Sequence, residues 1–126
     1  MIIGVGIDAI EIDRVRTALT RTPSLQQRLF TDSERASCTS RCGRLRFGGL
    51  AGRFAAKEAV AKAFGTGIRG FVFRDIEVGN DALGKPVVRL HGRAAEVASS
   101  LGIASVHLSL THTDDMAMAQ VVAESA

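Results

Sequence analysis

The sequence contains no tryptophan and no tyrosine, and six phenylalanines are its only aromatic residues. Modules that bind single-stranded nucleic acid stack the bases on aromatic side chains beside basic ones, so this scarcity argues against a nucleic-acid partner. Two cysteines, Cys38 and Cys42, are too few for a disulfide framework. Two prolines and the absence of a long Gly/Ser tract exclude a linker or a fibrous repeat.

Long hydrophobic runs are also missing. The longest charge-free apolar stretches fall far short of the roughly 20 residues that cross a bilayer. The apolar opening, residues 1–12, contains Asp8 and Glu11 and has neither a basic leader nor a cleavage site. We therefore expect a cytoplasmic protein with free thiols and no membrane partner.

What is present fits one globular domain spanning residues 1–126. A hydrophobic fraction of 46% over 126 residues is enough to form a core. A domain this small buries only about two thirds of its unfolded surface, so association between copies would help to stabilise it.

Positive charge is concentrated in one third of the chain. Residues 1–13 carry three acids and no base, residues 14–53 carry nine arginines against two acids, and residues 54–126 are nearly balanced. Such a patch attracts an acidic partner. Nucleic acid, an anionic membrane, a phosphate-bearing small molecule and an acidic protein all fit it, as does a plain solvated helix face.

Hydrophobic periodicity predicts an α+β fold, because helices and strands mix without strict βαβ alternation. Strands are expected over 2–12, 71–78, 87–90, 104–111 and 116–123, and helices around 15–19, 25–30, 32–38, 50–64 and 92–101, with loops at 40–49, 80–85 and 112–115. The first and last strands are predicted to be buried.

Three local patterns carry sharper expectations. Gly4 and Gly6 inside a strand indicate close approach of another backbone. Residues 31–34 form a capping box, in which a threonine hydroxyl and a glutamate satisfy the first amides of a helix. Cys38 and Cys42 are four apart and would share a helical face, but without a second pair of ligands they do not form a zinc site.

Asp8 is out of place in a strand of isoleucine, valine and glycine. A carboxylate there is costly unless it is paired, bound to a metal or exposed at the strand end. On the alanine-rich helix, Glu58 and Lys62 have the spacing and order of a favourable surface pair, although Phe54 and Ala61 on the same side suggest partial burial. Asp8 and Glu58 together would hold one Mg²⁺, which binds one or two carboxylates plus water and substrate phosphates.

Two further segments have the composition of ligand contacts. Residues 65–67, Gly-Thr-Gly, follow the helix and offer unhindered backbone amides, a weak signal for phosphate binding. Polar side chains alternate along residues 105–111, where they either line a pocket or face water; they are Ser105, His107, Ser109 and Thr111. No Ser-His-Asp arrangement is indicated.

Taken together, these residues resemble a known family. G-V-G-I-D at 4–8, E-I-D-R at 11–14 and R-F-A-A-K-E-A-V-A-K-A-F-G at 53–65 are similar to the diagnostic segments of the small bacterial holo-[acyl-carrier-protein] synthases, which are 4′-phosphopantetheinyl transferases. L-F-T-D-S-E at 29–34, G-K-P at 84–86 and H-L-S-L-T-H at 107–112 follow in the family's order. The least similar stretch is about 39–49.

The resemblance implies a magnesium-dependent enzyme of lipid metabolism. It would transfer 4′-phosphopantetheine from coenzyme A to a serine of apo-acyl carrier protein, giving holo-acyl carrier protein and adenosine 3′,5′-bisphosphate. Family members are homotrimers with active sites at subunit interfaces. The sequence leaves open whether the carrier protein serves fatty-acid or polyketide synthesis.

The resemblance also implies roles for individual residues. Asp8 and Glu58 match the family's metal ligands, and Lys62 matches its active-site lysine; these three form the predicted catalytic set. Coenzyme A contacts carry over to Arg53, Lys62, Gly65, Thr66, Gly67, Lys85, Pro86, His107, Ser109 and Thr111. Carrier-protein contacts carry over to Arg14 and, more loosely, to Arg21 and Arg28.

The physical chemistry of phosphoryl transfer agrees with this assignment, because positioning and charge neutralisation supply most of the catalysis. The serine proton would pass to Glu58 or to a metal-bound water, and Lys62 would neutralise or protonate the leaving group. Two alternatives from other classes are another magnesium-dependent phosphate-ester or pyrophosphate enzyme and a basic nucleic-acid-binding module.

Overall fold

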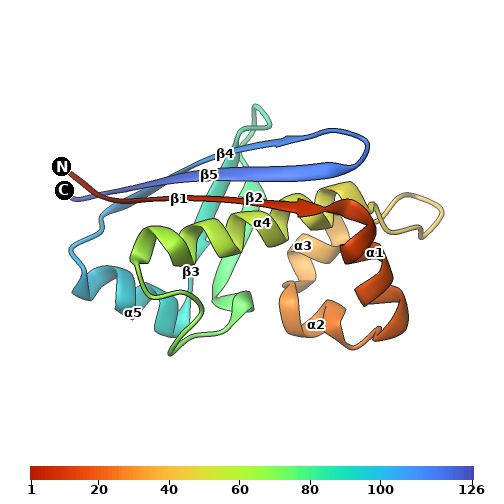
Figure 1. Cartoon of the computed structure of the whole chain (residues 1–126), viewed down its shortest axis with the longest axis horizontal. Helices are drawn as coiled ribbons and strands as arrows, with labels where there is room; N and C mark the ends of the chain where they lie inside the picture. The colour runs from red at the N-terminus through yellow and green to blue at the C-terminus, as the bar shows by residue number, and fades with distance from the viewer.

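The computed structural model describes all residues 1–126 and is built on a three-stranded antiparallel sheet with one long helix across its inner face (Figure 1). The strand order is β1 (Ile2–Glu11), β5 (Met116–Glu124), β4 (Ser105–His112). The helix, α4, spans Phe47–Phe64. The two chain ends lie side by side, because the amide of Ser125 donates to the carbonyl of Met1 at 2.8 Å. An α+β fold is confirmed.

Strand β1 lies on α4 without any side chain between the two backbones. A Cβ added at Gly4 or Gly6 would overlap the carbonyl oxygen of Ala63 or Ala59. The expected close approach is therefore confirmed, and its partner is the alanine-rich helix. The alanines serve the same purpose, since small side chains let a helix and a strand pack closely.

The prediction that β1 is a buried strand was wrong. Gly6 is its only buried residue, and Val5 and Ile7 are 61% and 57% exposed. The reason is that β1 is an edge strand with one covered face, so every second residue points away from α4. The closing strand β5 is central, but it also exposes Met118 and Gln120 on the same outer face.

Three short helices pack at one end of the sheet (Figure 1): α1 (Ile12–Arg21), α2 (Leu25–Leu29) and α3 (Asp32–Ser37). The capping box at the start of α3 is confirmed, with the hydroxyl of Thr31 accepting from the amide of Glu34 at 3.2 Å and the carboxylate of Glu34 accepting from the amide of Thr31 at 2.9 Å.

Two expectations about residues 38–49 were wrong. Helix α4 begins at Phe47, so Gly48 and Gly49 are helical rather than part of the loop. Cys38 is buried at the end of α3 and Cys42 is exposed in the following turn, because α3 ends before it could place both thiols on one face.

A two-stranded hairpin completes the fold, formed by β2 (Ile76–Asn80) and β3 (Pro86–Leu90). The predicted strand over 71–78 is shorter than expected, because residues Phe73–Asp75 form the 3₁₀ helix η1. Helix α5 (Gly92–Ser100) leads into β4. The main core lies between α4, the sheet, β2 and α5. No helix is long and apolar enough to span a membrane.

Candidate active site

The crossing of β1 and α4 brings an acid and a base together. Asp8 has the same strand parity as Gly4 and Gly6, so its side chain faces the helix. The ammonium Nζ of Lys62 donates to Oδ1 of Asp8 at 3.0 Å and to the carbonyl oxygen of Ile7 at 2.8 Å. Asp8 is mostly covered, with 19% of its side chain exposed, whereas Lys62 is 52% exposed. Lys62 is therefore held at the strand but remains accessible to solvent.

Glu58 lies one helical turn before Lys62 and is half-buried. Burial raises the pKa of its carboxyl, the negative charge of Asp8 raises it further, and Lys62 opposes both effects. The two carboxylates are thus close enough to interact electrostatically. No ion pair joins Glu58 to Lys62, so the surface pair that their spacing suggested is absent; Lys62 pairs with Asp8 instead.

The donor set suits a hard divalent cation. Asp8 and Glu58 offer carboxylate oxygens, the ligands that Mg²⁺ prefers. No third Asp, Glu, His or Cys side chain joins them as a potential ligand. An ion at this position would complete its coordination with water and substrate phosphates, as magnesium does in phosphate-transfer sites.

The turn after α4 differs from the expectation of free amides. The amide of Gly65 donates to the carbonyl of Lys62 at 3.0 Å, and the amide of Gly67 donates to that of Ala61 at 3.3 Å. Gly65 adopts φ +79°, the left-handed conformation that closes many helices. Both glycine amides are therefore engaged in ending the helix and are not free as expected, while a coenzyme A contact through residues 65–67 stays a prediction.

Arg53 is tied to the hairpin turn that carries Lys85 and Pro86. Its Nη2 donates to Oδ1 of Asn80 at 3.4 Å, and Nδ2 of Asn80 donates to the carbonyl of Gly84 at 2.9 Å. Asn80 was predicted only as part of a turn, and nothing in its sequence context indicates this bridge.

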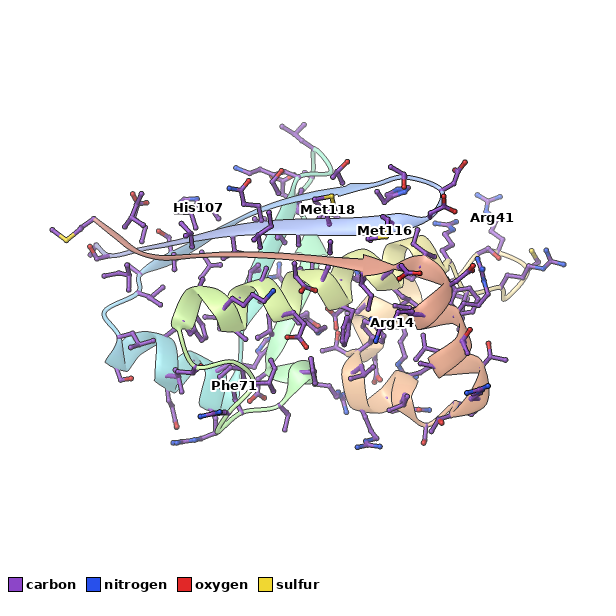
Figure 2. All side chains as sticks on the ribbon, in the orientation of Figure 1. Arg14, Arg41, Phe71, His107, Met116 and Met118 are labelled. Carbon is purple, nitrogen blue, oxygen red and sulfur yellow. The ribbon has the colours of Figure 1, made fainter.

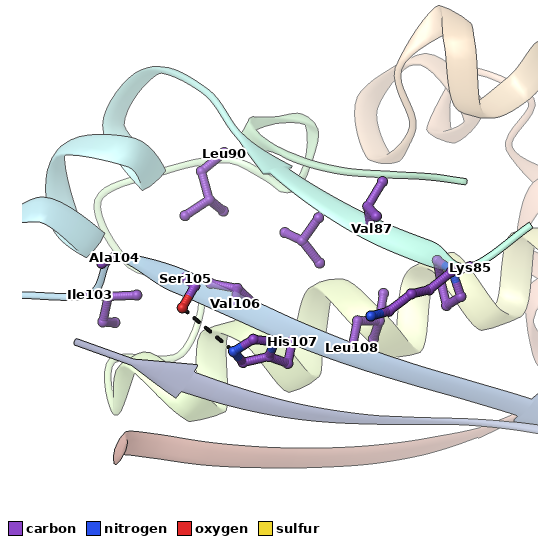
Figure 3. A pocket seen from close by; sticks show the side chains of 11 residues that line it. Lys85, Val87, Leu90, Ile103, Ala104, Ser105, Val106, His107 and Leu108 are labelled. Atoms are coloured by element: carbon purple, nitrogen blue, oxygen red, sulfur yellow. Dashed lines mark hydrogen bonds between the residues drawn. The ribbon is translucent and has the colours of Figure 1, made fainter. Parts of the chain in front are cut away.

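A cavity of about 450 Å³ opens between β3 and β4 (Figure 3). Lys85, Pro86, Ser105 and His107 contribute to its lining, together with apolar side chains of both strands. Nε2 of His107 lies 3.5 Å from the hydroxyl of Ser105 and 3.0 Å from Oε1 of Glu124. The hydrogen bond from His107 lowers the pKa of Glu124.

The alternating side chains of β4 divide as predicted. Leu108 is buried, and His107, Ser109 and Thr111 are exposed on the opposite face. Figure 2 shows His107 and Met118 on the side of the sheet away from α4.

The predicted coenzyme A contacts therefore do not meet in one place within a single chain. Lys62 and residues 65–67 lie on or just beyond the helix that faces β1. Lys85, Pro86 and His107 line the cavity, and Ser109 and Thr111 face outward.

Two grooves near the short helices are bordered by predicted carrier-protein contacts. Arg14 is exposed on α1 and lines a groove of about 190 Å³ with Ala18, Leu29 and Phe54. Arg28 is exposed on α2 and lines a second groove. That groove has a volume of about 570 Å³ and is also lined by Leu25, Ile68, Phe73 and Arg74. Apolar floors with cationic rims suit a partner that combines acidic and apolar side chains.

Sequence reasoning missed a buried ion pair between Glu34 and Lys57, whose side chains are both 0% exposed. Burial lowers the pKa of Lys57, and the neighbouring Glu34 opposes that shift. The only local signal is a lysine among alanines on the most buried helix. Its partner lies 23 residues away, and no periodicity connects the two.

Nearly the whole chain matches one family of known proteins. The model of the 4′-phosphopantetheinyl transferase superfamily matches residues 4–121. The chain is 49% identical over 124 residues to the holo-[acyl-carrier-protein] synthase of Clostridium novyi (strain NT), covering 98% of this chain and 88% of that protein.

Two crystal structures of similar proteins share the fold. The holo-[acyl-carrier-protein] synthase from Neisseria meningitidis aligns with a TM-score of 0.89 at 38% identity, covering 99% of this chain and 100% of that one. The holo-(acyl-carrier-protein) synthase from Bacillus anthracis str. Ames, in complex with CoA (3′,5′-ADP), aligns with a TM-score of 0.81 at 40% identity, covering 100% and 99%.

Proposed function

Because the chain belongs to the 4′-phosphopantetheinyl transferase superfamily and transfers 4′-phosphopantetheine from coenzyme A to apo-acyl carrier protein, we propose that the β1–α4 crossing is where this reaction takes place. The observation that carries the proposal is the approach of Asp8, Glu58 and Lys62 at one position. Two carboxylates and one ammonium are the groups that a pyrophosphate-bearing substrate and its metal require.

Asp8 and Glu58 are the residues that would hold Mg²⁺, and the ion would neutralise charge on the pyrophosphate when bound. The hydrogen bond of Lys62 to the backbone of Ile7 keeps its ammonium beside Asp8 while leaving it exposed to substrate. This ammonium would bind the departing 3′,5′-ADP and offset its developing negative charge.

Glu58 is the proposed general base for the carrier-protein serine. Asp8 is already paired with Lys62, whereas Glu58 makes no ion pair. Glu58 is therefore the carboxylate of the site that is not already ion-paired with Lys62, and one of its oxygens would accept the proton of the serine hydroxyl. The serine oxygen would then attack the β-phosphorus, and the bond from that phosphorus to the 3′,5′-ADP oxygen would break.

We also propose that copies of the chain associate through the outer face of the sheet, giving the homotrimer that the family resemblance implies. Five large apolar residues of β1 and β5 are each 40–63% exposed in the single chain: Ile2, Ile3, Val5, Ile7 and Met118. Contiguous exposed apolar side chains mark interaction surfaces. Association would also unite contacts that one chain keeps apart, since Ser109 and Thr111 lie on this same face beside Ile7.

The acidic carrier protein is proposed to dock on the exposed arginines of α1 and α2. Arg14 and Arg28 border the two apolar grooves, and Arg14 and Arg21 lie together on one face of α1. Cationic side chains around an apolar floor would steer an acidic helix and then bury its apolar residues.

The test is mass spectrometry of apo-carrier protein incubated with coenzyme A, Mg²⁺ and the purified chain. A mass increase equal to one phosphopantetheine on the carrier serine is expected. The Asp8→Ala variant should give none, and Asp114→Ala, in the exposed turn between β4 and β5, serves as the matched control. A normal adduct with Asp8→Ala would refute the proposed site.

A further inference from the structure

The ion pair between Glu34 and Lys57 is fully satisfied as well as fully buried. Nζ of Lys57 donates to Oε1 of Glu34 at 2.8 Å, to the carbonyl of Phe73 at 3.1 Å and to the carbonyl of Ile76. Oε2 of Glu34 accepts from the amide of Val78 at 2.9 Å. All three ammonium protons and both carboxylate oxygens therefore have partners.

These bonds join four elements of the fold. Glu34 belongs to α3 and Lys57 to α4, while Phe73 and Ile76 lie in η1 and at the start of β2. The ammonium thus holds the backbone of η1 against the middle of α4. Thr31 extends the connection, because its hydroxyl donates to Oε2 of Glu77 at 2.7 Å.

The segment held by Lys57 lines the groove beside Arg28 and packs on a residue that lines the groove beside Arg14. The ring of Phe73 stacks on the ring of Phe54, with centroids 5.5 Å apart. Phe54 lines the groove beside Arg14, and Phe73 lines the groove beside Arg28. Because this stack joins one residue of each groove, a displacement of η1 would alter the lining of both grooves.

Stability alone does not explain this pair. A buried ion pair is often no more stabilising than apolar residues of similar volume, because both charges lose their hydration. The pair instead fixes the relative positions of the segments that it joins, since each hydrogen bond holds a particular acceptor at a particular distance.

We propose that Glu34 and Lys57 are positioning residues for carrier-protein docking, acting through η1 and the Phe54–Phe73 stack. This inference rests on the docking surface proposed above. Lys57 precedes Glu58 in the sequence, but successive helical residues point about 100° apart, and Lys57 points toward α3 and η1. Its removal should therefore affect carrier-protein recognition and leave coenzyme A binding unchanged.

The experiment is steady-state kinetics of the full chain with the double variant Glu34→Gln/Lys57→Met, which removes both charges and so leaves no uncompensated buried ion. The apparent KM for apo-carrier protein should rise by about tenfold or more, with the KM for coenzyme A and kcat within about twofold. Ala98→Gly, a buried change in α5, is the control for general destabilisation and should leave both KM values unchanged.

A folded double variant with an unchanged KM for carrier protein would overturn the inference, as would equal rises in both KM values. If the double variant does not fold, Glu34→Asp keeps both charges but shortens the acidic side chain by one methylene, so it alters the same contacts and should still raise the carrier-protein KM; an unchanged value overturns the inference. The variants Arg14→Glu and Arg28→Glu distinguish a failure of the proposed docking surface from a failure of the positioning role alone. If they leave that KM unchanged, the docking surface itself is wrong, and if only they raise it, the positioning role alone fails.

Discussion

Replacing Gly6 by alanine should damage the active site without touching a reacting group. The added Cβ would overlap the carbonyl oxygen of Ala59 and lie 2.8 Å from its carbonyl carbon, whereas ordinary van der Waals contact begins at 3.4 Å. The overlap with the carbonyl oxygen is the larger one, because the added Cβ would lie only 1.8 Å from it; strand and helix must therefore separate by about 1.2 Å before that distance reaches 3.0 Å. Asp8 is two residues further along the same face of β1, so the displacement reaches it directly.

The effect on the site follows from the distances. An added 1.2 Å would stretch the 3.0 Å contact between Lys62 and Asp8 to about 4.2 Å, beyond hydrogen-bond range. Misplacement by about 1 Å costs on the order of 100-fold in rate, so we expect kcat to fall by about 10-fold to 100-fold. Overpacking should cost about 1–3 kcal/mol of unfolding free energy.

The assay is carrier-protein loading measured beside thermal unfolding. At roughly 4 °C per kcal/mol for a chain of this length, the Tm should drop by about 4–12 °C. Gly52→Ala is the matched control on the same helix, because its Cβ would meet nothing within 4 Å and alanine favours the helix by about 0.5–1 kcal/mol. Wild-type kcat and Tm in the Gly6→Ala variant would refute the reasoning.

Three further outcomes are expected. Asp8→Ala and Glu58→Ala should each abolish Mg²⁺-dependent transfer while circular dichroism shows the fold intact; normal turnover by either would contradict the metal assignment. Ile7→Lys places a charge on the outer sheet face, so light scattering should show loss of association, and an unchanged assembly would exclude that face as the interface. The hydrogen bond from Thr31 lowers the pKa of Glu77, with burial opposing it and His91 assisting. A lowered folded-state pKa adds stability above the ordinary carboxyl value of 4.5, which is lost as the pH falls through the folded value. Glu77→Gln should therefore lose less stability than wild type between about pH 6 and about pH 3 in denaturant titrations, and equal losses would show that Glu77 carries no such contribution.

Much of the local structure was predictable because it depends on neighbouring residues. The capping box at Thr31 needs only a hydroxyl and a glutamate three residues later. The alternation along β4 places Leu108 inside and Ser109 outside whatever lies against the sheet. Gly4 and Gly6 were informative because glycine weakens a strand. Its presence inside one therefore indicates that another backbone packs too closely for a side chain to fit.

The predictions that failed involve contacts between distant segments. The hydrophobic run of β1 looks like that of a buried strand, but its burial depends on whether both faces are covered, and in one chain only α4 covers it. The amides of Gly65 and Gly67 looked available because glycine is unhindered, but the ending of α4 engages both. Composition cannot distinguish a loop that is free to bind from one that is already capping a helix.

The sequence by itself determined most of the elements, the family and the three residues of the proposed catalytic set, since periodicity, capping and motif spacing are properties of short segments. Only the tertiary structure decided that Lys62 pairs with Asp8 across 54 positions rather than with Glu58 one turn away. It alone paired Lys57 with Glu34 inside the core and divided the predicted coenzyme A contacts between separate surfaces. Electrostatic partners are chosen by distance and burial in three dimensions, and neither quantity is encoded in local spacing.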